Sequence, residues 1–367
     1  MENCALKYEE IVETVYINSV DDFYKNVVYS KDLPHYIYRG HSKSDSYKLQ
    51  PGLLRNLQGT LQKRNEFYLS ELRALILFYT EANKHGLYVP KVDSFFQHGL
   101  ANNFDVSLML KDTDVKWLSD DLIELTSLAQ HYGMKTRLLD WTQDIRVALY
   151  FACSEKEKNE EDMAIWCIDA SFLEDWNNDN SITDICLATI LSYDGKGDRA
   201  EKYALIYALI DKGVPIRFFL PRYYKNDNIA SQKGVLSLWQ YNLACKEIYR
   251  NSDNRNDITE LPLSDTIPTD VEMLRNNISE HMEEFLNADI IRDTEPLDKL
   301  LLDYFDQFEY RRKEIRKRPY KILRKLILKN SLKDDFVLRL KADGYDAASI
   351  FPGYESIVKV VNNELLL

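Results

Sequence analysis

The chain has 367 residues, of which 45% are apolar and 29% are charged, a balance typical of a soluble globular protein. Its net charge of −12 argues against general adhesion to DNA or RNA, because nonspecific binding depends mainly on Lys and Arg neutralising phosphates. The 5 cysteines are scattered without a CxxC pair, so neither a disulfide framework nor a metal site is expected. The sequence shows no signal-peptide pattern and no run of about 20 apolar residues, which predicts a cytoplasmic protein that does not enter the membrane.

The first part of the chain is predicted to form a strand and a short helix over residues 7–30, within a lead-in that spans 1–35. The aromatic and branched residues of "YIYRGHS", residues 36–42, predict a buried strand that stops at a glycine. "SYKLQPGLLRN" is expected to form a second extended piece that ends in a turn at Pro51-Gly52. Helical spacing of apolar residues then predicts a helix from about Leu61 to Asn83.

The densest pattern is "LIELTSLAQHYGMKTRLLDWTQDIRVALYFACS", residues 122–154. It predicts a helix that ends near Gly133, since glycine suits a left-handed cap. A short strand is expected in "KTRLLDW", and Thr142 and Asp144 are starting signals for a second helix. Polar residues therefore collect at the turns between two apolar helices.

The rest of the chain predicts strands in "AIWCIDA" and "VPIRFFLPR", a helix over 190–213, and a loop around Gly234 that leads into a strand. Residues 246–308 are acidic and polar, with a helix expected at 270–288, and are interpreted as an insertion. From Tyr310 to Lys329, 10 basic residues stand against 1 acidic residue. We interpret this stretch as a solvated strand face, with nucleic-acid contact as the alternative. A helix, a turn and a short helix are expected to close the chain.

The first group of residues with possible chemistry is Tyr38-Arg39-Gly40, at the end of the predicted strand. A guanidinium offers a rigid fork of donors that matches phosphate or carboxylate, and the glycine leaves room for a ligand to approach the backbone. The structural alternative is an arginine that pairs with a core carboxylate.

The second group lies at the turns around residues 131–133 and 136–142. A helix that begins at Thr142 would present free backbone N–H groups to an anion, and Tyr132 and Trp141 are predicted to sandwich a flat ring. Taken singly, His131 is explained equally well as a satisfied core histidine, Thr142 as a helix cap, and Arg137 with Asp140 as a structural salt bridge. As a cluster, so many polar residues would be costly to bury without a function.

The third group is "ASQKGVL", where Gln232 stands on a turn that leads into a strand. Its amide is suited to reading a sugar hydroxyl or a base edge, and the alternative is a plain turn residue. "GKGD" at 195–198 lacks the setting of a phosphate-binding loop, and no GxSxG elbow is present.

Taken in order, "YIYRGHS", "LQPGLLR", "LAQHYGMKTRLLDWTQDIRVALYFAC", "NIASQKGVLSL" and "LKADGYDAASIFPG" resemble the bacterial FRG domain family, named for its aromatic-Arg-Gly motif. The resemblance runs from about Tyr36 to Val361. It implies a core over 36–245, an insertion over 246–308 and a C-terminal part of the domain over 309–367. The implied fold is α+β, with an ADP-ribosyltransferase-like split antiparallel sheet core, surrounding helices and a helical insertion.

The resemblance also implies roles for residues. In that fold an arginine on the first core strand holds the phosphates and ribose of NAD, a Ser or Thr follows on a second strand, and a third strand brings a glutamate. This chain departs from the pattern at the third strand, where Gln232 lacks the negative charge that would stabilise developing positive charge. Asp140, Glu355 and Glu66 are the alternative sources of that charge. The expected catalytic residues are Arg39, His131, Asp140 and Gln232. The expected NAD-binding residues are Tyr38, Gly40, Tyr132, Arg137, Trp141, Thr142 and Tyr150.

Three functions are compatible with these residues. The first is an NAD-binding ADP-ribosyltransferase or NAD glycohydrolase, a bacterial toxin or anti-phage effector that transfers ADP-ribose to a protein or nucleic-acid acceptor or to water. The second is a non-catalytic module that senses a nucleotide or nucleic-acid end and signals to a protein partner. The third is a nuclease or hydrolase that uses Asp140 and His131. The toxin or anti-phage setting of the first function rests on family analogy.

Overall fold

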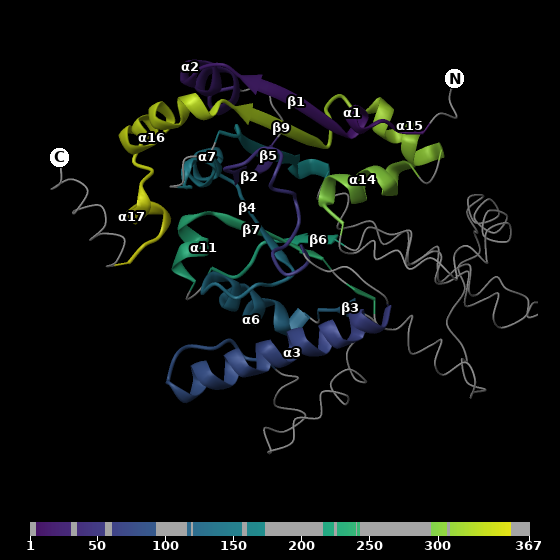
Figure 1. The fold of residues 1–367 in the computed structure, drawn as a ribbon, viewed down its shortest axis with the longest axis vertical. Coiled ribbons are helices and arrows are strands. Elements are labelled where there is room, and N and C mark those ends of the chain that lie inside the picture. Colours follow the sequence, from purple (N-terminus) through teal and green to yellow (C-terminus); the bar gives the residue numbers. More distant parts are fainter. Residues whose placement is uncertain are drawn as a thin grey trace, which may run out of the picture.

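The computed structural model describes residues 5–30, 35–55, 61–92, 116–118, 120–155, 160–172, 216–223, 226–239, 241–242, 295–306 and 309–353. Seven strands form one sheet in the order β1-β9-β5-β2-β4-β7-β6 (Figure 1). Its strands are β1 Val12–Ile17, β2 Tyr36–His41, β4 Leu138–Thr142, β5 Met163–Asp169, β6 Ile216–Phe219, β7 Gly234–Trp239 and β9 Leu323–Leu328. The short strands β3 Lys116–Trp117 and β8 Tyr241–Asn242 pair separately.

The helices surround this sheet. They are α1 Tyr8–Ile11, α2 Val20–Phe23, α3 Leu61–Lys84, α6 Asp120–His131, α7 Ile145–Cys153, α11 Asp227–Ser231, α14 Leu297–Asp306, α15 Glu309–Lys317, α16 Lys333–Ala342 and α17 Ala347–Ile350. A π-helical turn, Tyr24–Val28, extends α2, and a 3-10 turn, Asn330–Leu332, precedes α16. The molecule is therefore α+β, as expected.

The sheet differs from the expected antiparallel core at one edge. β1 and β9 run parallel, with Val12 opposite Leu323, whereas the other neighbours in this sheet run antiparallel. Parallel strands need a long connection, and these two are separated by most of the chain. The lead-in 1–35 and the C-terminal part 309–353 therefore complete one sheet together with the strands between them.

The core lies on both faces of the sheet, because the inner strand β5 is buried along its whole length. All 7 residues of β5 are buried, and their side chains alternate between two clusters. Met163, Ile165 and Cys167 pack with α2, α7 and α16, while Trp166 and Ile168 pack with α14 and α15. A third cluster joins α3 and α6 to β4 and β7.

Most predicted elements are found in the described residues, with four differences. The basic stretch from Tyr310 to Lys329 is not one strand face, since Glu309–Lys317 form helix α15 and only Leu323–Leu328 form a strand, β9. "SYKLQPGLLRN" forms bends and turns rather than a strand. Thr142 ends β4 instead of starting a helix, since α7 begins at Ile145 with Asp144 as its N-cap. Helix α14 falls inside the range 246–308, yet its apolar side chains, such as Leu300 and Phe305, are buried in the core. The helices expected over 190–213 and 270–288 lie outside the described residues.

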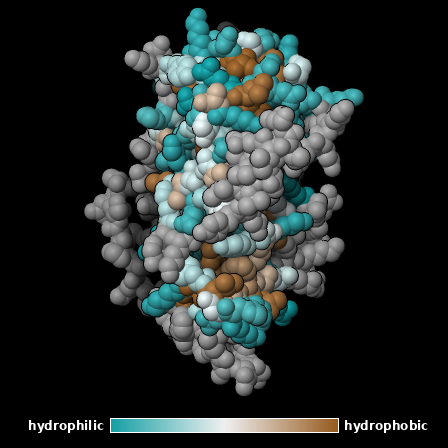
Figure 2. All heavy atoms as spheres, turned by 90° about the vertical axis from the view of Figure 1, so that its left-hand side faces the viewer, coloured by the Kyte–Doolittle hydropathy of each residue, from teal (hydrophilic) through white to brown (hydrophobic). Residues whose placement is uncertain are grey.

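The face that carries α11, α16 and α17 shows its apolar side chains in separate groups, divided by a mostly hydrophilic or neutral band at mid-height (Figure 2). Within the described residues no helix is both long and apolar enough to cross a membrane.

The contact between β2 and β4 is unusually short for two neighbouring strands. A single residue pair, Tyr38 with Thr142, joins them, whereas β2 pairs with β5 over 6 residues and β4 with β7 over 5. Beyond that pair the ladder opens, and the sheet has a gap in its middle.

Gly40 holds helix α7 close to the sheet beside this gap. A Cβ built on Gly40 would lie 1.9 Å from the Ala148 carbonyl oxygen and 2.7 Å from the Ala152 nitrogen. The missing side chain therefore makes room for the α7 backbone. This corrects the interpretation of Gly40 as clearance for a ligand, although the residue also lines the pocket described below. It also links the "YRG" and "ALYFA" motifs physically, since each provides a small residue at the contact.

We expect Gly40→Ala to lower the free energy of unfolding by about 3 kcal/mol or more, because the clash with helix backbone forces α7 away from the sheet. Gly52→Ala is the matched control, since a Cβ at Gly52 meets nothing within 4 Å. Urea denaturation measures both. Equal stability of the two variants would contradict the close contact between Gly40 and α7.

Candidate functional site

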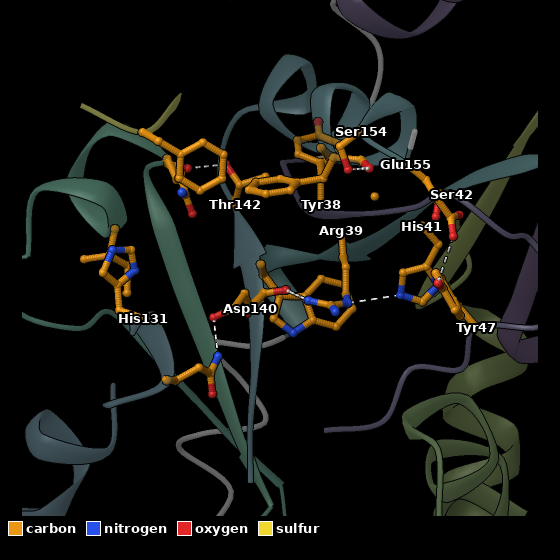
Figure 3. A pocket seen from close by; sticks show the side chains of 18 of the residues that line it. Tyr38, Arg39, His41, Ser42, Tyr47, His131, Asp140, Thr142, Ser154 and Glu155 are labelled. Atoms are coloured by element: carbon orange, nitrogen blue, oxygen red, sulfur yellow. Dashed lines mark hydrogen bonds between the residues drawn. The ribbon is translucent and has the colours of Figure 1, made fainter. Parts of the chain in front are cut away.

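A pocket of about 570 Å³ lies where β2 and β4 part. β2 contributes Arg39 and His41 to its lining, β4 contributes Asp140 and Thr142, and α7 contributes Phe151. Figure 3 shows Arg39 in the middle of these groups, between Asp140 and His41. The volume falls in the range of about 300–1,000 Å³ that is usual for ligand pockets.

Arg39 closes the gap between the two strands with its side chain. Its Nη1 donates to the backbone carbonyl of Asp140 at 2.6 Å, and its Nε donates to Nε2 of His41 at 3.0 Å. Among the described residues, Nη2 has no hydrogen-bond partner and no carboxylate forms a salt bridge with this guanidinium. Burial lowers the pKa of Arg39 to about 10, with a smaller contribution from the charge of Arg55, so the side chain stays cationic at neutral pH. The structural alternative of an arginine neutralised by a core carboxylate is not what the geometry shows.

His41 accepts a hydrogen bond from Arg39 on the side away from Asp140 (Figure 3). The residue is 3% exposed, and burial, followed by the charges of Arg39, Arg55 and Lys325, lowers its pKa well below the usual value. The ring is therefore neutral, which leaves Nε2 free to accept the hydrogen bond from Arg39.

The opposite side of the pocket is rich in hydrogen-bonding groups. Gln130 donates to Oδ1 of Asp140 at 2.6 Å, and Thr136 donates to the Gln130 side chain. The ring of His131 contacts the amide of Asn228. The Asp140 carboxylate is open to solvent but surrounded by the pocket walls, and this reduced hydration raises its pKa. The charge of Arg39 acts in the other direction.

Thr142 lies in the pocket wall, but its hydroxyl is already engaged. It donates to the Gln232 carbonyl at 2.6 Å and accepts from the backbone N–H of Asp144 at 3.0 Å. The carboxylate of Asp144 caps the start of α7 through the Arg146 N–H, and it also binds Lys233 and Tyr345. This corrects the expectation of an anion site at the helix start, because a protein carboxylate already occupies it.

Gln232 lines the pocket and connects it to the C-terminal segment. Its Nε2 donates to the Ile350 carbonyl at 3.3 Å, and the Ser231 hydroxyl donates to the same oxygen at 2.9 Å. The next residue, Phe351, also lines the pocket and packs edge-on against Phe151. Gln232 thus serves as a link between α11 and α17.

Arg137 does not reach the pocket. It is 1% exposed and forms a two-pronged ion pair with Glu71, and its Nη1 donates to the Trp239 carbonyl at 3.0 Å. The expected NAD contact of Arg137 is therefore corrected to a buried salt bridge, and its partner is Glu71 on α3 rather than Asp140.

The expected aromatic sandwich is also absent from the described geometry. Tyr132 is 76% exposed and lies outside the residues that line the pocket. Trp141 lines the wall but is 3% exposed, and its indole N–H donates to Ser237 in the core. Tyr150 packs against Phe351 and lies outside the residues that line the pocket. The aromatic surfaces at the pocket come from Tyr38, Tyr47, Trp141, Phe151 and Phe351.

Sequence reasoning missed several residues of the pocket, chiefly His41, Tyr47, Arg55 and Glu155. Glu155 follows Ser154, the C-cap of α7, and forms a 3.2 Å salt bridge with Lys43. The hydrogen bond from Ser42 and the charge of Lys43 lower its pKa, so its carboxylate is ionised at neutral pH. The sequence offered one clue to Glu155: it comes soon after helix α7, which carries the "ALYFA" residues of the family resemblance. Glu355 and the side chain of Glu66 lie outside the described residues.

No group of three or more His, Cys, Asp or Glu side chains suited to a metal ion occurs in the parts of the chain that the structure describes.

The neutral state of His41 predicts a pH-dependent stability. The pKa of His41 is lowered in the folded protein, so below about pH 6.5 the unfolded chain binds a proton at this residue and the folded chain does not. The free energy of unfolding therefore falls as the pH falls. We expect the free energy of unfolding to fall between pH 7.5 and 5.5 by up to about 1.4 kcal/mol per pH unit from this group. His41→Gln, which keeps an acceptor for Arg39, is expected to flatten the profile, whereas the same change at the exposed His85 leaves it as in the wild type. Identical profiles for all three proteins would refute the neutral ring.

The comparisons with known proteins give a match to a family model. Residues 34–161 match the FRG domain family model. No curated protein matches the chain, and no solved structure does. The matched segment contains β2, β4 and α7, and it ends before α11, whose C-cap is Gln232, and before α16 and α17, which carry the C-terminal motif. The protein therefore carries an FRG domain, in the segment that forms both strands beside the pocket.

Proposed function

We propose that this pocket binds NAD and that the protein cleaves the bond between nicotinamide and ribose, as an ADP-ribosyltransferase or an NAD glycohydrolase. The observation that carries the proposal is Arg39, whose cationic side chain lies at the opening of the sheet with Nη2 unpaired among the described residues. A guanidinium edge of this kind matches the oxygens of a phosphate group.

The single residue pair between β2 and β4 supports a relationship to the ADP-ribosyltransferase-like fold. The resemblance implies a split sheet in that fold, with NAD held at the arginine of the first core strand. Arg39 occupies the corresponding motif, and the pocket opens beside it. Tyr38, Phe151 and Phe351 offer apolar surfaces for flat rings, and Asp140 and Gln130 offer acceptors for sugar hydroxyls.

The proposed reaction breaks the bond between ribose C1′ and the nicotinamide nitrogen. The bonding electron pair leaves with nicotinamide, which becomes neutral, and positive charge develops on the ribose. Water or an acceptor nucleophile then bonds to C1′ and releases a proton, so that NAD and water give ADP-ribose, nicotinamide and H⁺. A carboxylate near C1′ would stabilise the developing charge, and the amide of Gln232 does not supply one.

Among the described residues, two carboxylates line the pocket, Asp140 and Glu155. Reduced hydration raises the pKa of Asp140, whereas hydrogen bonding and the charge of Lys43 lower the pKa of Glu155. Glu155 is therefore the better source of an ionised carboxylate, although Lys43 compensates part of its charge through the 3.2 Å salt bridge. We assign it the stabilising role and give Asp140 the recognition of sugar hydroxyls.

A non-catalytic sensing module is the second candidate, and one observation favours it. Gln232 and Phe351 both line the pocket, and Gln232 is hydrogen-bonded to Ile350 on α17. A ligand that displaces Phe351 would also move the C-terminal segment and change a surface for a protein partner. The hypothesis of a nuclease or hydrolase using Asp140 and His131 stays a prediction, as does the toxin or anti-phage setting.

We expect Arg39→Gln to weaken NAD binding by about 10- to 100-fold, because it removes a charge-assisted hydrogen bond to phosphate. Arg39→Lys keeps the charge but loses the fork, and an intermediate affinity is expected. Isothermal titration calorimetry measures both, and melting temperatures check that each variant is folded. The control is Arg222→Gln, whose side chain is 82% exposed and lies outside the pocket lining. Unchanged NAD affinity in both Arg39 variants would overturn the proposed phosphate contact.

Nicotinamide release from NAD, followed by chromatography, tests the catalytic step. We expect the wild type to release nicotinamide and Glu155→Gln to do so at least about 100-fold more slowly with similar NAD affinity. Glu160→Gln, at an exposed position outside the pocket lining, is the control. A larger loss in Asp140→Asn than in Glu155→Gln would reverse the two assigned roles. NAD binding that depends on Arg39 without any nicotinamide release would favour the sensing module.

A further inference from the structure

Arg55 gives the pocket a second cation that the proposed NAD site does not use. It ends the "LQPGLLR" motif in the turn after β2, and its guanidinium lines the same pocket as Arg39. Among the described residues no carboxylate forms a salt bridge with Arg55. Its Nε donates to the Gln50 carbonyl at 3.2 Å, which leaves both Nη groups available.

Hydrogen bonds and core packing fix the backbone of the turn that ends at Arg55. Leu54 is 3% exposed in the core, and its N–H donates to the Pro51 carbonyl at 3.0 Å. The neighbouring Leu53 N–H donates to the Thr136 carbonyl, which ties the turn to the segment that leads into β4. The motif therefore fixes the backbone position of Arg55, whose side chain lines the pocket.

The two arginines share one electrostatic environment. The charge of Arg55 contributes to the lowered pKa values of Arg39 and of His41. Two guanidinium groups that face the same space repel each other, and Asp140 is the group that offsets this charge at Arg39. An anion bound between them would remove the repulsion.

We propose that Arg55 is a specificity-determining residue, which together with Arg39 selects ligands that carry a diphosphate over those that carry a single phosphate. Each guanidinium then binds one phosphate group of the pair, since a guanidinium fork matches two phosphate oxygens. This proposal rests on the proposed function, which supplies the nucleotide nature of the ligand. The substrate class is then a nucleoside joined to a diphosphate.

The test compares ADP with AMP by calorimetry. We expect the wild type to bind ADP about 10-fold or more tightly than AMP. Arg55→Gln is expected to weaken ADP by about 10- to 50-fold and AMP by less than about 3-fold. The control is Arg73→Gln on α3, an exposed arginine outside the pocket lining, and melting temperatures verify that the variants fold. The preference for ADP should shrink at high salt, because the Arg55 side chain is exposed.

Inorganic pyrophosphate and phosphate form a second pair of probes that needs no nucleoside. Pyrophosphate binding that depends on Arg55, without any nucleotide binding, would support the diphosphate site and sink the proposed NAD function. Equal binding of ADP and AMP, or an equal loss of both in Arg55→Gln, would overturn the proposed selectivity and leave the NAD function standing. Failure of all four probes to bind the wild type would overturn both.

Discussion

The structure of the site depends on one interruption in a hydrogen-bonded sheet. β2 and β4 meet at Tyr38 and Thr142 and then part, so backbone groups beyond that pair need other partners. Arg39 supplies one, because its guanidinium donates to the Asp140 carbonyl across the gap. The side chain is thereby fixed at the edge of the pocket, and part of its donor set still faces the pocket. A cation held in this way is suited to binding an anion with little rearrangement.

The contact of Gly40 with α7 explains why two motifs that lie about a hundred residues apart belong to the same site. The glycine lets the helix backbone approach β2 to within contact distance of Ala148 and Ala152. The same helix starts at the Asp144 cap, whose carboxylate also binds Lys233 and Tyr345. Through these contacts the turn before β7 and the segment after α16 are both tied to the start of α7. The pocket walls therefore come from distant parts of the chain that one helix brings together.

The elements with strong local patterns were predictable from the sequence, and the pairings between distant residues were not. Helix α3, strand β5 and the strand-helix unit of β4 and α7 follow from periodicity and capping residues. Arg137, like Arg39, is an arginine near one end of a predicted strand, and only the fold reveals that Glu71 neutralises it in the core. Thr142 and Asp144 are both good caps, and the choice between them depends on the hydrogen bond of Thr142 to Gln232. Glu155 and Arg55 join the pocket through tertiary packing, which leaves no periodic signal.

The resemblance pointed to a missing glutamate, and the geometry changes how that absence is interpreted. Gln232 is engaged with the C-terminal segment, while an ionised carboxylate, Glu155, lines the pocket at the other end of α7 from the Thr142 turn. A site can obtain the charge it needs from a different element, since catalysis requires a group at the right place rather than on a particular strand. The central claim is that Arg39 holds a phosphate group. A crystal structure of the protein with ADP-ribose tests it most directly. The account predicts a phosphate oxygen within hydrogen-bonding distance of Nη2 of Arg39, and ADP-ribose bound elsewhere, with no phosphate near Arg39, would contradict it.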